Sequence, residues 1–99
     1  MALLYAMIKG FADKATQSVF DRQHSKRLPV QVQRQAHRKL LQIHAASRIE
    51  TLRVPPGNHL ERLSGDRAGQ YSVRINRQWR ICFEWRAGDA YDVEIADYL

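Results

Sequence analysis

The stretch that decides the fold is residues 61–85, Glu61-Arg-Leu-Ser-Gly-Asp-Arg-Ala-Gly-Gln-Tyr-Ser-Val-Arg-Ile-Asn-Arg-Gln-Trp-Arg-Ile-Cys-Phe-Glu-Trp85. From Tyr71 onward apolar and polar residues alternate, which is typical of strands with one buried face. A short turn after Asn76 divides the stretch into two strands. The apolar face carries Tyr71, Val73, Ile75, Trp79, Ile81, Phe83 and Trp85, and the polar face carries Ser72, Arg74, Asn76, Arg80, Cys82 and Glu84. We therefore expect a sheet whose uncovered face displays guanidinium groups, which bind phosphate well.

Further elements are expected on both sides of this stretch. Asp13 is the expected N-cap of a first helix, and Pro29 suits the first turn of a second. The expected elements are a strand at 7–11, helices at 14–23 and 29–46, and a last strand at 90–98 with Tyr91, Val93 and Ile95 alternating with polar residues. The order β-α-α-β-β-β predicts an α+β domain, in which an antiparallel sheet has the two N-terminal helices packed on one face and leaves the other exposed.

Length and charge narrow the class of protein. The 99 residues suit one domain, 1–99, and Met7 is an alternative start that would make residues 1–6 an N-terminal extension. A net charge of +6 and a pI near 10.0 favour an anionic partner, with nucleic acid first, an acidic protein second and an anionic membrane surface third. The single cysteine excludes an internal disulfide. With no recognisable signal peptide or membrane span, we expect a cytoplasmic protein that does not insert in a membrane.

The second expected helix carries a basic face of Arg34, Arg38 and Lys39. This face is either solvated charge or a stripe that binds RNA phosphates. The four histidines of the chain lack the spacing of a zinc site, so neither a metal nor another cofactor is expected.

Three motifs carry a resemblance to a known family. They are Leu60-Glu-x-Leu-x-Gly-Asp-Arg-x-Gly-Gln-Tyr-Ser-Val-Arg-Ile-Asn76, Gln78-Trp-Arg-Ile-Cys-Phe83 and Asp92-Val-Glu-Ile-Ala-Asp-Tyr98. From about Met7 to its end, the chain resembles the HigB branch of the RelE/ParE superfamily of type II toxins. The resemblance implies a RelE-like fold and an endoribonuclease, an mRNA interferase, that cleaves messenger RNA codons in the ribosomal A site. Attack of a 2′-hydroxyl on the adjacent phosphate would need no metal. The partners implied are the ribosome, messenger RNA and a HigA-like helix-turn-helix antitoxin, through which alone operator DNA would be contacted.

The same resemblance suggests which arginines bind RNA. Arg80 is similar to the family arginine that contacts the scissile phosphate, and Arg74 is expected beside it on the same face. Arg67 and Arg77 are further RNA-binding candidates, and Arg67 has the alternative role of pairing with a carboxylate or holding its turn.

At the positions where the resemblance suggests an acid and a base, this chain departs from many relatives. Many relatives end in Asp-Tyr-His, whereas this chain ends in Asp97-Tyr98-Leu99, and Glu61 stands where some relatives place a histidine and Ser64 where they place a lysine. Glu61 is therefore either a general base or an ion-pair partner of Arg80 or Arg62.

Three other groups are candidates for the remaining proton transfers. Asp97 suits an orienting role and Tyr98 suits stacking on a base or donating a proton, although either could instead cap the sheet edge. His59 lies in the proline-rich loop and either replaces the missing imidazole in space or is a solvent-exposed loop residue.

A second function remains open for a chain with these departures. The same fold with little or no catalysis would act as a binding module that occupies the ribosome, DNA gyrase or the antitoxin. A generic basic nucleic-acid-binding protein is the third alternative.

Overall fold

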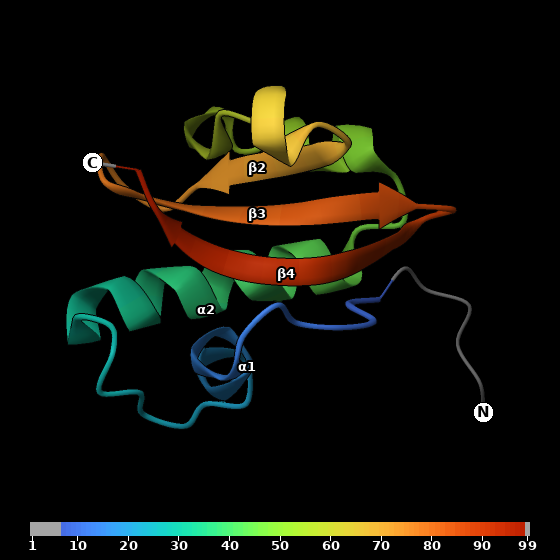
Figure 1. Ribbon diagram of the computed structural model, residues 1–99. Coiled ribbons are helices and arrows are strands. Elements are labelled where there is room, and N and C mark those ends of the chain that lie inside the picture. The colour runs from blue at the N-terminus through green and yellow to red at the C-terminus, as the bar shows by residue number, and fades with distance from the viewer. Residues whose placement is uncertain (1–6, 99) are drawn as a thin grey trace.

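The computed structural model describes residues 7–98, which form two helices and a four-stranded antiparallel sheet (Figure 1). The helices are α1 (Lys14–Phe20) and α2 (Val30–Ala45), and the strands are β1 (Glu61–Arg62), β2 (Gln70–Arg74), β3 (Trp79–Arg86) and β4 (Asp89–Asp97), in the sheet order β1-β2-β3-β4. Short 3-10 helices η1 (Ile49–Arg53), η2 (Pro56–Asn58) and η3 (Gly65–Arg67) connect α2 to the strands. The α+β class and the antiparallel sheet are confirmed.

Both α-helices lie on the same side of the sheet (Figure 1). The apolar stripe of α2, spaced by four, four and three residues, is buried against the apolar faces of β2, β3 and β4. The core consists mainly of Val32, Ala36, Leu40 and Ile43 from α2 and Val73, Ile81, Phe83, Val93 and Ile95 from the sheet. The alternation in residues 71–85 therefore predicts the buried face correctly, including Trp79 and Trp85, which pack against this core.

The N-cap of α1 is the predicted one, but its C-terminus comes earlier than predicted. Asp13 Oδ1 accepts a hydrogen bond from the Thr16 N–H at 2.7 Å. The helix ends at Phe20 because Arg22 adopts the left-handed conformation at φ +61°, and the Gln23 and Arg22 N–H groups then bond back to the Ser18 and Val19 carbonyls. This is a Schellman-type end. The end of α2 agrees with prediction to within one residue, and Pro29 directly precedes its first turn.

The predicted strand at 7–11 is wrong as a continuous strand. This segment makes only two isolated parallel bridges to β4, Ile8 with Ala90 and Phe11 with Val93. A β-bulge in β4, with Asp92 at φ +52°, interrupts regular pairing between the two bridges. The sequence pattern also missed β1, a two-residue strand that pairs with β2 at the sheet edge.

The bulge also overturns one predicted orientation. Because one extra residue lies between Tyr91 and Glu94, Tyr91 pairs with Glu84 on the polar side of the sheet, away from the apolar face of Val93. The Arg86 guanidinium lies over the Tyr91 ring, 4.0 Å from its centre.

The polar side of the sheet is less exposed than predicted. Ser72 and Cys82 face each other there and are both fully buried. Arg67 crosses this side from η3, where it donates hydrogen bonds to Gln70 at 3.0 Å and to Glu94 at 3.1 Å. The Arg67 side chain thus covers part of the middle of the polar face, and the end of this face nearest the β2–β3 turn is hollowed.

None of the helices that the structure describes is both long enough and apolar enough to span a bilayer.

Candidate functional site: an arginine-lined groove

A groove of about 360 Å³ lies at the end of the polar face, beside the turn that joins β2 to β3. Its lining comes from the loop after η2, from β1, from the β2–β3 turn and from the ends of β2, β3 and the chain. The lining residues are His59, Glu61, Arg74, Asn76, Arg77, Arg80 and Tyr98. Of the eleven residues predicted from the sequence to act in catalysis or RNA binding, six meet here.

Arg80 is the most firmly held side chain of the groove. Its Nε donates to Ser72 Oγ at 2.7 Å, and its Nη2 donates to the His59 carbonyl oxygen at 2.7 Å. The same Nη2 lies 3.3 Å from Glu61 Oε1. With a side chain only 11% exposed, Arg80 has little freedom to move. Among residues 7–98 nothing accepts a hydrogen bond from Nη1, so this edge of the guanidinium stays available to an anion.

Ser72 is a site residue that the sequence pattern did not reveal. Strand alternation places Ser72 on the same face as Cys82, and the structure pairs the two, but a small polar residue on an expected open face looks like ordinary surface. In the structure it is fully buried, and its hydroxyl is the acceptor that orients Arg80. We regard Ser72 as a positioning residue, since it acts through the guanidinium that it holds.

The β2–β3 turn brings two more guanidinium groups to the groove. Asn76 Oδ1 accepts from the N–H groups of Gln78 and Trp79, both at 2.8 Å, and so shapes the turn from which Arg77 projects. Arg74 pairs in register with Arg80, and its Nε donates to the Asn76 carbonyl at 3.0 Å. Asn76, which was not predicted as a site residue, therefore organises this wall.

Tyr98 forms the wall at the C-terminal end of the groove. The centre of its ring lies 6.0 Å from the Arg80 guanidinium carbon, and its hydroxyl oxygen is 3.5 Å from Cys82 Sγ. Burial, followed by the hydrogen bond to the Cys82 thiol, raises the pKa of Tyr98 above its usual value of 10.0. The phenol therefore stays protonated at neutral pH and can donate a hydrogen bond.

The loop that carries His59 is anchored to α2 by hydrogen bonds of Asn58. Asn58 is fully buried, and its Nδ2 donates to Gln42 Oε1 at 3.1 Å and to the Leu52 carbonyl at 3.1 Å. Lys39 donates to Asn58 Oδ1, so this lysine, predicted to bind RNA, anchors the loop instead of standing free. Burial, then the neighbouring Arg38, lowers the pKa of Lys39.

His59 itself adopts the left-handed conformation at φ +43°. Such backbone costs free energy for a residue other than glycine, and it persists here because Asn58 and Arg80 hold the loop on either side. The predicted approach of His59 to Arg80 is thus observed, through both the backbone carbonyl and the position of the side chain at the groove.

Besides Lys39, four predicted residues lie outside the groove. Asp97 pairs in register with Trp79, which places it on the opposite side of β4 from the groove, where it accepts from Gln78 Nε2 at 3.1 Å. Arg67 is paired with Glu94, which agrees with the carboxylate-pairing alternative. Arg34 and Arg38 are exposed on α2, on the helical side of the sheet.

The charges that line the groove suit the binding of an anion. Three guanidinium groups face one carboxylate, and one of them is almost buried, where electrostatic interactions are stronger than in water. An imidazole and a protonated phenol are available for proton transfer. Within the part of the chain that the structure describes, no three His, Cys, Asp or Glu side chains gather closely enough to hold a metal ion.

Comparison with known proteins gives consistent matches over nearly the whole chain. A family model described as the RelE-like toxin of the type II toxin-antitoxin system HigB matches residues 9–99. The chain is 37% identical over 81 residues to Toxin HigB-1 of Vibrio cholerae, covering 81% of this chain and 85% of that protein. It is 33% identical over 92 residues to Endoribonuclease HigB of Proteus vulgaris, covering 93% and 99%.

Proposed function

Since the chain belongs to the HigB family of RelE-like toxins of type II toxin–antitoxin systems, we propose that it is a ribosome-dependent endoribonuclease whose groove cleaves messenger RNA in the A site. The observation that carries this proposal is the convergence of Arg74, Arg77 and Arg80 on one groove, with Arg80 fixed by three contacts. A relative over nearly the full length is named an endoribonuclease, which supports the reaction class.

In the proposed reaction the 2′-hydroxyl of the RNA attacks the adjacent phosphorus. The P–O5′ bond breaks, leaving a 2′,3′-cyclic phosphate and a free 5′-hydroxyl. The phosphorane-like transition state carries an additional negative charge on its non-bridging oxygens. The open Nη1 edge of Arg80 is placed to stabilise this charge, with Arg74 in support. Because Arg80 is already oriented, little reorganisation is needed when the charge develops.

Two proton transfers complete the reaction. We assign the general base to His59, because its imidazole lines the groove and histidine exchanges protons near neutral pH. The protonated Tyr98 hydroxyl donates its proton to the leaving 5′-oxygen, which becomes the free 5′-hydroxyl. Glu61 then pairs with Arg80 Nη2 in the free protein, and the RNA phosphate displaces the Glu61 carboxylate when it binds.

The remaining predicted cations take supporting roles in this proposal. Arg77 at the rim holds the RNA backbone next to the scissile linkage, and Arg67 stiffens the floor through Glu94. The exposed Arg38 contributes to binding ribosomal RNA, an interaction carried by phosphate contacts. The family implies an antitoxin partner, which we propose is a HigA-like helix-turn-helix protein, and a cytoplasmic site of action.

A second function is favoured by one observation. Neither Leu99 nor Asp97 supplies the terminal imidazole and carboxylate expected at the groove, since Asp97 lies on the other side of β4. A toxin that blocks the ribosome without cutting RNA would tolerate this loss.

Incubation of the purified protein with messenger RNA, with and without programmed ribosomes, tests the proposal. We expect cleavage only with ribosomes, at the A-site codon, with cyclic phosphate and 5′-hydroxyl ends. Intact messenger together with arrested translation would select the blocking function instead. Cleavage of free RNA at the same rate would refute ribosome dependence.

A further inference from the structure

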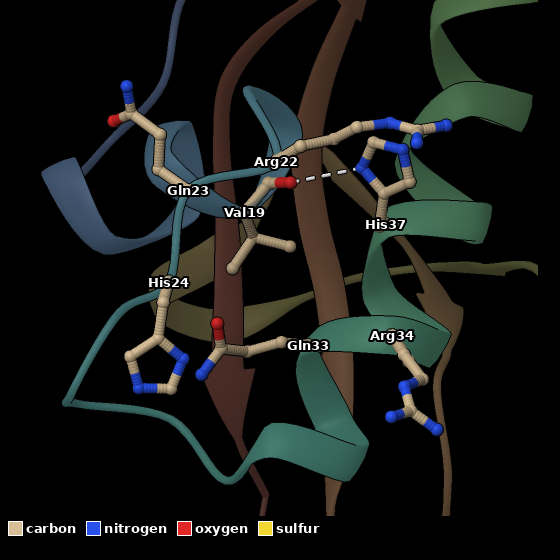
Figure 2. A pocket seen from close by; sticks show the side chains of 7 residues that line it. All are labelled: Val19, Arg22, Gln23, His24, Gln33, Arg34 and His37. Carbon is tan, nitrogen blue, oxygen red and sulfur yellow. Dashed lines mark hydrogen bonds between the residues drawn. The ribbon is translucent and has the colours of Figure 1, made fainter.

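A second hollow, of about 390 Å³, lies on the helical side of the molecule, far in chain position from the arginine-lined groove (Figure 2). It is formed where the C-terminal end of α1 and the following turn meet the first half of α2. Its lining residues are Val19, Arg22, Gln23, His24, Gln33, Arg34 and His37. We call the set Arg22, His24, Arg34 and His37 the basic hollow.

Hydrogen bonds fix the walls of the basic hollow. His37 Nδ1 donates to the Val19 carbonyl at 3.0 Å, which ties α2 to the end of α1 (Figure 2). One turn earlier on α2, the Gln33 amide donates to the Ser25 and Leu28 carbonyls, both at 2.7 Å. These bonds span the connection between the helices at two points, so the hollow is formed before any partner binds.

Three side chains of the basic hollow are not used by the fold. Among residues 7–98, the side chains of Arg22, His24 and Arg34 have no hydrogen-bond or ion-pair partner. The Nε2 atom of His37 is buried, again without a partner in the described chain. None of the described residues that line the hollow is acidic. Arg22 occupies a left-handed helix end where glycine is usual, and its side chain extends across the hollow toward α2 (Figure 2).

This arrangement lacks a carboxylate or another anion. Carboxylates beside Arg22 and beside Arg34 would accept charge-assisted hydrogen bonds from these guanidinium groups.

Two exposed apolar residues indicate that the occupant is a protein and not RNA. Val30 is 57% exposed and Leu41 is 43% exposed. Positions 30, 34, 37 and 41 follow spacings of four, three and four residues, so these apolar side chains share one face of α2 with Arg34 and His37. RNA phosphates gain nothing from Val and Leu, whereas a partner protein would bury them.

We propose that the basic hollow, together with Val30 and Leu41, is the docking surface for an acidic amphipathic segment of the cognate antitoxin. Carboxylates of that segment contact Arg22 and Arg34, and flanking apolar side chains cover Val30 and Leu41. The inference rests on family membership, which implies the antitoxin, and not on ribonuclease activity. The groove for RNA is on the other side of the sheet.

Affinity of purified toxin variants for the purified cognate antitoxin tests the proposal. We expect Arg22→Glu/Arg34→Glu to weaken binding by about 100-fold or more, because cations at an interface centre become repulsive. Val30→Ser/Leu41→Ser leaves the charge unchanged and should weaken binding by about tenfold. The matched control is Arg53→Glu/Arg62→Glu, which makes the same charge change at two exposed arginines elsewhere and should alter affinity less than about threefold.

Circular dichroism and thermal unfolding establish that each variant is folded, and Arg34→Glu alone is the substitute if the double variant is not. Wild-type affinity for both hollow variants would overturn the proposal. So would equal weakening by the control pair, which would indicate non-specific charge attraction. Unchanged antitoxin affinity with weakened ribosome binding would assign the hollow to RNA and would also overturn it.

Discussion

Replacing the buried Ser72 by alanine tests how the site is held. The hydroxyl accepts the Arg80 Nε–H at 2.7 Å in a fully buried position, so Ser72→Ala leaves a guanidinium N–H without an acceptor. A hydrogen bond to a charged group contributes about 1.5–3 kcal/mol. We expect the free energy of unfolding to fall by an amount within this range.

The same change should lower the rate of the chemical step. Arg80 keeps its contacts to the His59 carbonyl and to Glu61, but both are made by Nη2, so the guanidinium can pivot about that atom. Misplacement by about 1 Å can cost roughly 100-fold in rate. We therefore expect the single-turnover cleavage rate on programmed ribosomes to fall by about 10- to 100-fold, which corresponds to about 1.4–2.7 kcal/mol of activation free energy.

Two comparisons separate positioning from general destabilisation. Ser64→Ala, in an exposed turn, is the matched control and should leave rate and stability unchanged. Ser72→Thr retains the hydroxyl and should recover more of the rate than Ser72→Ala does. A stable Ser72→Ala variant with wild-type cleavage, or a destabilised one whose single-turnover rate is unchanged, would refute the positioning role.

Three further predictions concern the groove and its support. His59→Asn, which tolerates the left-handed backbone, should lower cleavage by about 100- to 10,000-fold, whereas Glu61→Gln should change the rate by less than about tenfold. Asn58→Ala removes the buried amide that fastens the loop and should lower the free energy of unfolding by about 2–4 kcal/mol in urea titration. Burial and the neighbouring thiol raise the pKa of Tyr98, so this phenol ionises at lower pH in the unfolded chain than in the folded chain. Its contribution to the free energy of unfolding is therefore full below pH 10.0, the ordinary value, and is lost as the pH rises through the folded pKa. Tyr98→Phe should reduce this alkaline loss of stability.

Each of these predictions has an outcome that contradicts it. A loss of more than 100-fold in Glu61→Gln with near-normal His59→Asn would transfer the role of general base to Glu61. Wild-type stability of Asn58→Ala would show that the loop is held by other contacts. An alkaline stability profile identical in wild type and Tyr98→Phe would show that this phenol ionises equally in the folded and unfolded chains.

The sequence predicted the arginine pair well because strand alternation is a strong constraint. Arg74 and Arg80 share a face in any antiparallel pairing of two alternating strands joined by a short turn, and they are in register in the structure. The same alternation predicts the orientation of Asp97, since it directly follows Ala96 and so points to the other side of the strand. Assigning Asp97 to the site followed the family motif against that alternation.

Other features had no signal in the sequence pattern. The bulge at Asp92 adds one residue to β4, which turns Tyr91 to the opposite face, and a charged residue at a left-handed position is hard to anticipate. Asn58 looked like an ordinary turn residue between prolines, although its amide is the buried anchor of the loop. Small polar residues that are buried by long-range contacts cannot be distinguished from surface residues by local periodicity.

The central claim is that Arg80 acts on the scissile phosphate, and single-turnover cleavage on programmed ribosomes measures it most directly. Arg80→Ala should lower the rate by at least about 100-fold, and Arg80→Lys should recover only part of it, since a lysine keeps the charge without the planar fork. Arg62→Ala, at an exposed arginine on the other side of β1, should cleave at the wild-type rate. Cleavage by a folded Arg80→Ala variant at the rate of Arg62→Ala would contradict the account.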